Sequence, residues 1–315
     1  MLEDRKISLE QWALLIVISR LMITMTYLSF FSDPPGNQSI WISDILTFFL
    51  HILITIPLYL LAERFKTLSI IEASEIILGK IGKIVGGMYI WFFVHITAIT
   101  LRQFGEFFTA VPYPETPIIV FIGITALAAS YAVHKDIENI CRVLEIVAPI
   151  ILFSIFLVIA LLLKDMDFKN LIPIVEADIL SILYGAFITV CRSSELLLIG
   201  MLYPCLNKPS SAKKSLFLCF LILTIIFAMI SVSTIAIFGI NEAQNRSFPF
   251  YNAVRMINIG NFLERVDAVY FAIWVLGMFI KISLFYYLAT IGIAQLIKLK
   301  DYKPIVMPLG AIIVS

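Results

Sequence analysis

The stretch FITVCRSSELLLIG (residues 187–200) places Arg192 and Glu195 three residues apart inside an otherwise apolar run. A charge near the centre of a bilayer costs at least about 2.5–3.5 kcal/mol, so such residues usually face a bundle interior and are paired there. Two side chains spaced i and i+3 lie on one helical face and interact. We expect Arg192 and Glu195 either to form a structural ion pair or to meet both charges of an amino-acid zwitterion. In the second case, Arg192 or opened backbone N–H groups would bind the carboxylate and Glu195 the ammonium.

The rest of the chain is equally apolar. Of 315 residues, 61% are hydrophobic and 14% are charged, too few charges to surround a soluble core. Runs of about 20 apolar residues recur, which is the length that an α-helix needs to cross a hydrocarbon layer of roughly 30 Å. The sequence therefore predicts an all-α polytopic membrane protein. The predicted spans are 10–31, 41–62, 84–104, 116–133, 143–164, 180–203, 215–239 and 267–297, with a ninth, 304–315, that is cut off by the end of the sequence.

The loops between these spans carry an uneven distribution of Lys and Arg. With the N-terminus inside, the inner segments hold 14 of the 23 basic residues and the outer loops hold 6. Cytoplasmic loops are enriched in Lys and Arg, so the sequence predicts a cytoplasmic N-terminus. The opening MLEDRKISLEQW has no small-residue cleavage site before the apolar run, which favours a retained first span over a cleaved signal peptide.

Two connections are expected to carry structure of their own. In LSIIEASEIILGK, Ser69 and Glu72 form a capping box and Gly79 supplies a stop, which predicts an interfacial cytoplasmic helix over 69–79. The outer loop over 241–265 mixes apolar and polar residues and is longer than about 15 residues, a length typical of functional loops. We interpret this loop as a helical lid over an outward-facing vestibule.

Two spans separated by five differ from the others in their polar centres. The first carries Ser19, Arg20 and then Thr24–Met25–Thr26, and the sixth carries Thr189 and the stretch 192–195. Interrupted helices at corresponding positions of two five-helix repeats are typical of inverted-repeat transporters, which bind substrate at the opened backbone. The pattern predicts a five-plus-five helix bundle, truncated here within the ninth span.

Several stretches resemble the spore germination permease family. They are LRQFGEFFTAVPYPETPI (101–118), CRVLEIVAPI (141–150) and FLERVDAVYFAIWVLGMFIKISLFYY (262–287), with ISLEQW (7–12) and GKIGKIVGGMYI (79–90) in support. This family comprises the B subunits of germinant receptors within the amino acid–polyamine–organocation superfamily. The chain departs from the family pattern in having Ser193 and Ser194 where a Gly usually precedes the glutamate of the sixth span. The first span has TMTYLSF where a Gly-containing break is usual.

The resemblance implies a ten-helix, transporter-like protein of the inner spore membrane. Its implied partners are an A subunit and a lipoprotein C subunit, with which it senses a small germinant, often an amino acid. The resemblance favours Glu195 over Arg192 as a ligand-binding residue.

The remaining candidate ligand contacts each have two interpretations. Thr24 and Thr26 offer hydroxyls to a ligand or bond their own helix backbone. Lys281 lies fourteen residues after Asp267, about 21 Å along a helix. It either replaces a coupled cation or changes its protonation, or it pairs with a carboxylate such as Glu195 for packing. The full set of candidate ligand residues is Thr24, Thr26, Thr189, Arg192, Ser193, Ser194, Glu195 and Lys281.

A second set of charged residues lies toward the span ends and in the loops. Arg20 either extends toward the cytoplasmic interface or acts as a gate paired with an acidic group. Arg102 and Glu106 lie one turn apart, and Glu106 is also within the expected reach of the lid arginines. We interpret these residues as closure or subunit contacts: Arg20, Arg102, Glu106, Arg246 and Arg255.

The sequence lacks the motifs of catalysis. His51 and His95 have no carboxylate at a metal-binding spacing, and core hydrogen bonding is expected for them. Three of the four cysteines lie in or beside apolar runs, which favours buried reduced thiols over a disulfide scaffold. No enzyme, cofactor, metal or nucleic-acid partner is expected. The leading hypothesis is a germinant-receptor membrane subunit; the alternatives are an amino-acid or amine permease, in one form proton-coupled, and a scaffold that binds no solute.

Overall fold

The computed structural model describes residues 6–26, 33–257 and 266–315 of the chain. Within these residues the regular structure is helical, apart from one isolated bridge between Ile7 and Leu206. The α-helices are α1 (Leu9–Thr26), α2 (Ile40–Arg64), α3 (Ile70–Leu78), α4 (Lys80–Ala110), α5 (Ile118–Lys135), α6 (Ile137–Leu162), α7 (Ile179–Cys191), α8 (Leu197–Leu202), α9 (Ala212–Phe238), α10 (Ile240–Asn245), α11 (Pro249–Met256), α12 (Val266–Leu296) and α13 (Lys303–Val314).

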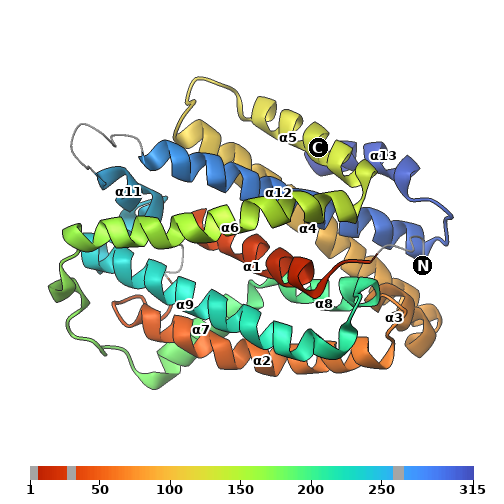
Figure 1. The fold of residues 1–315 in the computed structure, drawn as a ribbon, viewed down its shortest axis with the longest axis horizontal. Coiled ribbons are helices and arrows are strands. Elements are labelled where there is room, and N and C mark those ends of the chain that lie inside the picture. The colour runs from red at the N-terminus through yellow and green to blue at the C-terminus, as the bar shows by residue number, and fades with distance from the viewer. Residues whose placement is uncertain (1–5, 27–32, 258–265) are drawn as a thin grey trace.

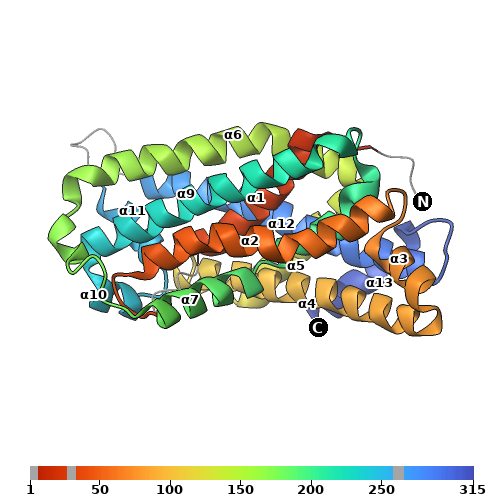
Figure 2. The ribbon, with the colours of Figure 1, turned by 90° about the horizontal axis from the view of Figure 1, so that it is seen from below.

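The long helices run side by side as an elongated bundle (Figures 1 and 2). Helix α1 lies inside it, in contact with α6, α9 and α12. The outer helices instead expose large apolar side chains, among them Phe49, Trp91, Ile124 and Phe153 on α2, α4, α5 and α6. Such surfaces are stable against lipid and not against water. The protein is thus an all-α polytopic membrane protein, and this prediction is confirmed.

Seven described helices are long and apolar enough to span a membrane, and an eighth span is formed if one bent pair is counted. That pair is the predicted sixth span, which divides into Ile179–Cys191 and Ser194–Cys205 with a bend of 54°. The predicted interruption of this span is therefore present. The predicted interruption of the first span at Thr24–Thr26 is not seen, because α1 continues unbroken through Thr26. The end of that predicted span, 27–31, lies outside the described residues.

The two ends of the bundle differ in what covers them. Helix α3 and the end of α12 lie at one end, which we call the α3 end; α10, α11 and the start of α12 lie at the other, the α11 end (Figures 1 and 2). Helices α10 and α11 occupy the first part of the predicted lid. Its remainder, 258–265, lies outside the described residues.

Helix α3 begins with the predicted capping box. Ser69 Oγ accepts a hydrogen bond from the Glu72 backbone N–H at 3.3 Å, and the Ser69 N–H donates to Glu72 Oε2 at 2.9 Å. The capping box is therefore confirmed. Helix α3 packs closely on α4, because a Cβ placed on Gly82 would lie 2.0 Å from the Ser74 carbonyl oxygen. Glycine at position 82 is what permits this approach.

Candidate functional site

The bend between α7 and α8 is held open by side chains that replace helical backbone bonds. Ser193 Oγ donates to the Thr189 carbonyl at 3.2 Å and lies 2.9 Å from His51 Nε2 on α2. Serine hydroxyls compete with the backbone for such bonds and bend helices. The predicted core hydrogen bond of His51 is therefore present. Its role is to secure the break from the neighbouring helix.

Arg20 caps the end of α7 at the break. Its Nη2 donates to the Thr189 carbonyl at 3.1 Å, and the guanidinium lies 5.2 Å from the centre of the Phe227 ring. A cation at a helix C-terminus interacts favourably with the partial negative charge of the unpaired carbonyls. The side chain is buried, so the interpretation that Arg20 extends toward the cytoplasmic interface is wrong. The acidic groups in electrostatic range of Arg20 are Glu195 and Asp44.

Lys281 and Glu195 form an ion pair in the core of the bundle. Lys281 Nζ bonds Glu195 Oε1, donates to the Ser19 carbonyl at 3.0 Å and lies 5.4 Å from the centre of the Phe285 ring. Both charged side chains are almost fully buried, with 1% and 2% exposed. The predicted pairing of Lys281 with Glu195 is therefore present. It joins three elements: α12, the start of the second half-helix, and the middle of α1.

Arg192 and Glu195 do not pair with each other, contrary to the expectation for a continuous helix. Arg192 bonds Asp33, with Nη2 to Oδ1 at 3.1 Å, whereas Glu195 bonds Lys281. The bend lies between the two residues, so the spacing i, i+3 no longer places them on one face. Arg192 is exposed and has Asp33 as its ion-pair partner.

Two buried oxygen atoms beside this ion pair lack partners. Among the described residues, Glu195 Oε2 and Ser19 Oγ have no hydrogen-bond partner. A buried polar group without a partner costs about 1–3 kcal/mol, more when it is charged, and so is rare in a folded protein. An unpaired carboxylate oxygen and a hydroxyl at a helix break form an acceptor-rich position suited to a ligand ammonium or hydroxyl group.

Asp44 on α2 was not among the residues singled out from the sequence. It is buried, and its carboxylate accepts a hydrogen bond from Ser231 Oγ of α9. The signal that identifies it is a lone acidic residue in the apolar run WISDILTFFL. An ionisable residue inside a membrane span is a functional candidate by default, with its partner named.

The threonines of α1 bond mainly to their own helix. Thr24 Oγ1 donates to the Arg20 carbonyl at 3.5 Å and Thr26 Oγ1 to the Met22 carbonyl at 2.7 Å, the local alternative to ligand contact. Trp274 Nε1 also donates to Thr26 Oγ1. Thr189 contributes its carbonyl to the site, and Ser194 is buried at the break beside Ser193.

The five charged residues interpreted as gate or lid contacts do not gather at one place. Arg20 belongs to the buried centre. Arg102 Nε and Glu106 Oε1 pair at 2.8 Å at the surface of α4, and Arg246, which directly follows α10, pairs with Glu242 of that helix. Arg255 lines a cavity at the α11 end. The closure roles of these residues stay predictions.

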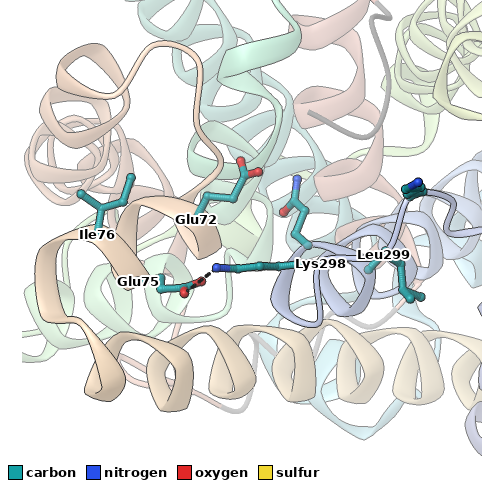
Figure 3. A pocket seen from close by; sticks show the side chains of 8 residues that line it. Glu72, Glu75, Ile76, Lys298 and Leu299 are labelled. Atoms are coloured by element: carbon teal, nitrogen blue, oxygen red, sulfur yellow. Dashed lines mark hydrogen bonds and ion pairs between the residues drawn. The ribbon is translucent and has the colours of Figure 1, made fainter.

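A large cavity of about 730 Å³ opens at the α3 end between α3 and the end of α12. Figure 3 shows Glu75 of α3 and Lys298 across this cavity, joined at 3.0 Å. The hydrogen bond from Lys298 lowers the pKa of the Glu75 carboxyl, and Lys83, 3.8 Å away, acts in the same direction. Behind them, Ser69 Oγ donates to Gln295 Oε1 at 2.7 Å, which ties α3 to α12.

The described residues offer no other obvious chemistry. They contain no group of three His, Cys, Asp or Glu residues that would hold a metal ion. The four cysteines form no disulfide with one another; Cys141 and Cys219 are buried, as the sequence indicates, whereas Cys191 is exposed beside the break.

Comparisons with known proteins give one consistent result. A family model described as "Spore germination protein" matches residues 6–315. Spore germination protein KB of Bacillus subtilis (strain 168) is 27% identical, over 98% of this chain and 83% of its own length. Spore germination protein YndE of the same organism is 24% identical, over 82% and 72%. Spore germination protein XB of Bacillus anthracis is 25% identical, over 66% and 58%. The resemblance stated from the sequence is confirmed.

Proposed function

This chain belongs to the family of spore germination proteins, and from that premise we propose that it is the membrane subunit of a germinant receptor. In this proposal it binds a small solute, such as an amino acid, at the buried centre between α1, the α7–α8 break and α12. It resides in the inner spore membrane with a cytoplasmic N-terminus. Its partners are a receptor A subunit and a lipoprotein C subunit.

The observation that carries the proposal is the ion pair of Lys281 with Glu195 at the helix break. The second oxygen of Glu195, Oε2, has no hydrogen-bond partner among the described residues. The same is true of Ser19 Oγ on α1. A ligand ammonium that donates to Oε2 would satisfy the carboxylate oxygen that Lys281 leaves without a hydrogen bond. The break supplies opened backbone groups for the ligand carboxylate, as in transporters built from discontinuous helices.

Ligand binding at this point would alter contacts that join three helices. The Lys281 ammonium bridges Glu195 and the Ser19 carbonyl, and the Arg20 guanidinium joins α1 to the Thr189 carbonyl of α7. A ligand ammonium competes with Lys281 for Glu195, so it favours a state in which these bridges are rearranged. A ligand shifts such an equilibrium by its difference in affinity for the two states. The partner subunits would read out the shift.

A permease for amino acids or amines is the second candidate. One feature that favours it is the 54° break of the sixth span, because such breaks are typical of transport proteins. Another is the burial of three ionisable side chains, those of Asp44, Glu195 and Lys281. In this form of the hypothesis Glu195 or Lys281 would carry the coupled proton. The permease differs from the receptor in one measurable property, which is net movement of solute across the membrane.

The experiment is binding and counterflow of the common radiolabelled L-amino acids in proteoliposomes that contain the full chain or its Glu195→Gln variant. Glu138→Gln is the matched control, because Glu138 is an exposed glutamate that pairs with Arg142. For the receptor we expect saturable binding without flux, with affinity reduced at least about tenfold in Glu195→Gln and unchanged in Glu138→Gln. Counterflow that is lost in Glu195→Gln would establish the permease instead.

The scaffold alternative is tested by the same preparation. Neither binding nor flux in the unmodified chain, with assembly of the A and C subunits intact, would overturn both solute-binding hypotheses. Because Glu195→Gln leaves Lys281 buried beside a neutral partner, its folding is checked by thermal unfolding. If Glu195→Gln does not fold, the double variant Glu195→Gln/Lys281→Met, which buries no unpaired charge at this position, replaces it in the test.

A further inference from the structure

A second cavity with charged and aromatic walls lies at the α11 end of the bundle. It has a volume of about 430 Å³ and lies where the end of α4, helix α11 and the start of α12 meet. Small-molecule sites have volumes of about 300–1,000 Å³, mostly apolar walls and a few convergent polar groups. Tyr113 and Phe271 form apolar wall here, and Arg255, Asp267 and Tyr251 supply the polar groups.

The two charges that face this cavity are of opposite sign and are available to a ligand. Arg255 lies in the last turn of α11 and Asp267 in the first turn of α12. Neither residue forms an ion pair with another described residue, with each other included, although both line one cavity. Arg255 is exposed and Asp267 is partly buried. A cation and an anion in the walls of one small cavity match the two ends of a zwitterion.

Tyr251 is a further group directed to the same place. Its side chain is 5% exposed and lines the cavity, and its hydroxyl makes no hydrogen bond with a described residue. Burial and the nearby Asp267 carboxylate raise the pKa of Tyr251, and Arg255 opposes this rise. Both charges therefore act at the Tyr251 hydroxyl. A buried ring whose hydroxyl has no partner among the described residues, in one cavity with Arg255 and Asp267, provides a neutral donor for a ligand carboxylate.

The apolar wall is rigid because its rings pack on one another. Phe107 of α4 lies beneath the cavity, with ring centres 5.3 Å from Tyr251 and 5.9 Å from Phe271. Phe107 also packs on Trp274 at 4.3 Å. Aromatic groups held in this way present a fixed apolar surface of low conformational entropy. Such a surface favours an apolar side chain on the ligand.

We propose that this cavity is a second binding site, for a free α-amino acid with an apolar side chain. Arg255 and the Tyr251 hydroxyl bind the carboxylate, Asp267 binds the ammonium, and the side chain lies against Tyr113 and Phe271. The site is separate from the buried centre, because Asp267 precedes Lys281 by fourteen residues of one helix, or about 21 Å. It goes beyond the proposed function and does not depend on it.

The test measures equilibrium binding of radiolabelled L-leucine to the full chain in nanodiscs, in a Glu195→Gln background that disables the buried centre. We expect saturable binding to persist there and to weaken at least about tenfold in Arg255→Gln or Asp267→Asn, the loss of one charge-assisted hydrogen bond. Arg142→Gln is the matched control, since it removes an exposed guanidinium from α6 that pairs with Glu138. We expect 4-methylpentanoate and isoamylamine, each of which keeps one charge, to compete at least about tenfold more weakly than L-leucine.

Several outcomes would overturn the proposal. One is equal L-leucine binding in Arg255→Gln, Asp267→Asn and Arg142→Gln. Others are loss of all binding in Glu195→Gln alone, or competition by the amine or the acid as strong as that by L-leucine. The charge swap Arg255→Asp/Asp267→Arg retains both charges and guards against a folding defect. A zwitterion binds to it in the reverse orientation, so we expect the swap to recover most of the affinity that either single variant loses.

Discussion

Two Lys–Glu pairs made by α12 and the residues just after it occupy opposite environments. Lys281 pairs with Glu195 where the side chains are 1% and 2% exposed, and Lys298 pairs with Glu75 where they are 68% and 26% exposed. The first lies in the core beside a helix break, and the second spans the cavity of Figure 3. Both pairs join a lysine to a glutamate. A difference in what the two pairs contribute to stability therefore reports the effect of burial.

Burial makes the inner pair indispensable without making it a large source of net stability. Two charges removed from water lose their favourable hydration free energy. Their mutual attraction offsets this loss only when the geometry is good and further hydrogen bonds are made. Lys281 has the Ser19 carbonyl as a second acceptor, but Glu195 Oε2 has no partner among the described residues. In water, the outer pair gains little from attraction and loses little on separation. The incompletely satisfied carboxylate supports our proposal that the inner pair is the ligand site.

The largest effect is expected from breaking the inner pair. Lys281→Met leaves Glu195 charged and buried without its cation, so we expect a loss of about 3–5 kcal/mol in the free energy of unfolding. Thermal unfolding in detergent measures it, with Lys298→Met as the control. Replacing both partners, in Lys281→Met/Glu195→Gln, is expected to recover most of the loss and to leave ligand binding at the buried centre abolished. Equal melting temperatures of Lys281→Met and Lys298→Met would contradict the comparison.

A smaller effect is expected from displacing α3, which carries Glu75 of the outer pair. In Gly82→Ala the new methyl group meets the Ser74 carbonyl at 2.0 Å without a shift of α3, and overpacking of this kind costs about 1–3 kcal/mol. Gly87→Ala is the matched control, because nothing lies within 4 Å of a Cβ at Gly87. Disulfide formation between Glu75→Cys and Lys298→Cys reports the geometry. Cross-linking that is equally efficient in Gly82→Ala and Gly87→Ala would show that packing on α4 does not position the pair.

The smallest effect is expected from removing the outer pair itself. The folded-state pKa of Glu75 is lowered, chiefly by the hydrogen bond from Lys298, so its contribution is present above the unfolded-state pKa and is lost as pH falls through the folded value. Lys298→Met should therefore lower the melting temperature slightly near neutral pH, and the difference from the unmodified chain should vanish in acid. Lys300→Met, which removes another lysine of the same cavity, should show no such pH dependence. A difference that grows in acid would have the wrong sign for this pair.

Much of this architecture follows from residues close together in the chain. Apolar runs predict the long helices, Ser69 and Glu72 predict the cap of α3, and polar residues at 192–195 predict the break in the sixth span. Each of these depends on hydrogen bonding or hydration within a few residues, which is physics that a short stretch of sequence contains. The resemblance to the spore germination family adds the function class in the same way, from contiguous motifs.

The partners of the charges were decided by the tertiary structure. Arg192 binds Asp33 instead of Glu195, Arg20 caps the carbonyl of Thr189, and Asp44 accepts from Ser231. The spacing of Arg192 and Glu195 predicts a pair only while the helix is straight, and the 54° bend separates them. A buried charge requires some partner, and the sequence states that requirement. Which partner satisfies it depends on how helices distant in the chain pack against one another, because only packing brings their side chains within hydrogen-bonding distance.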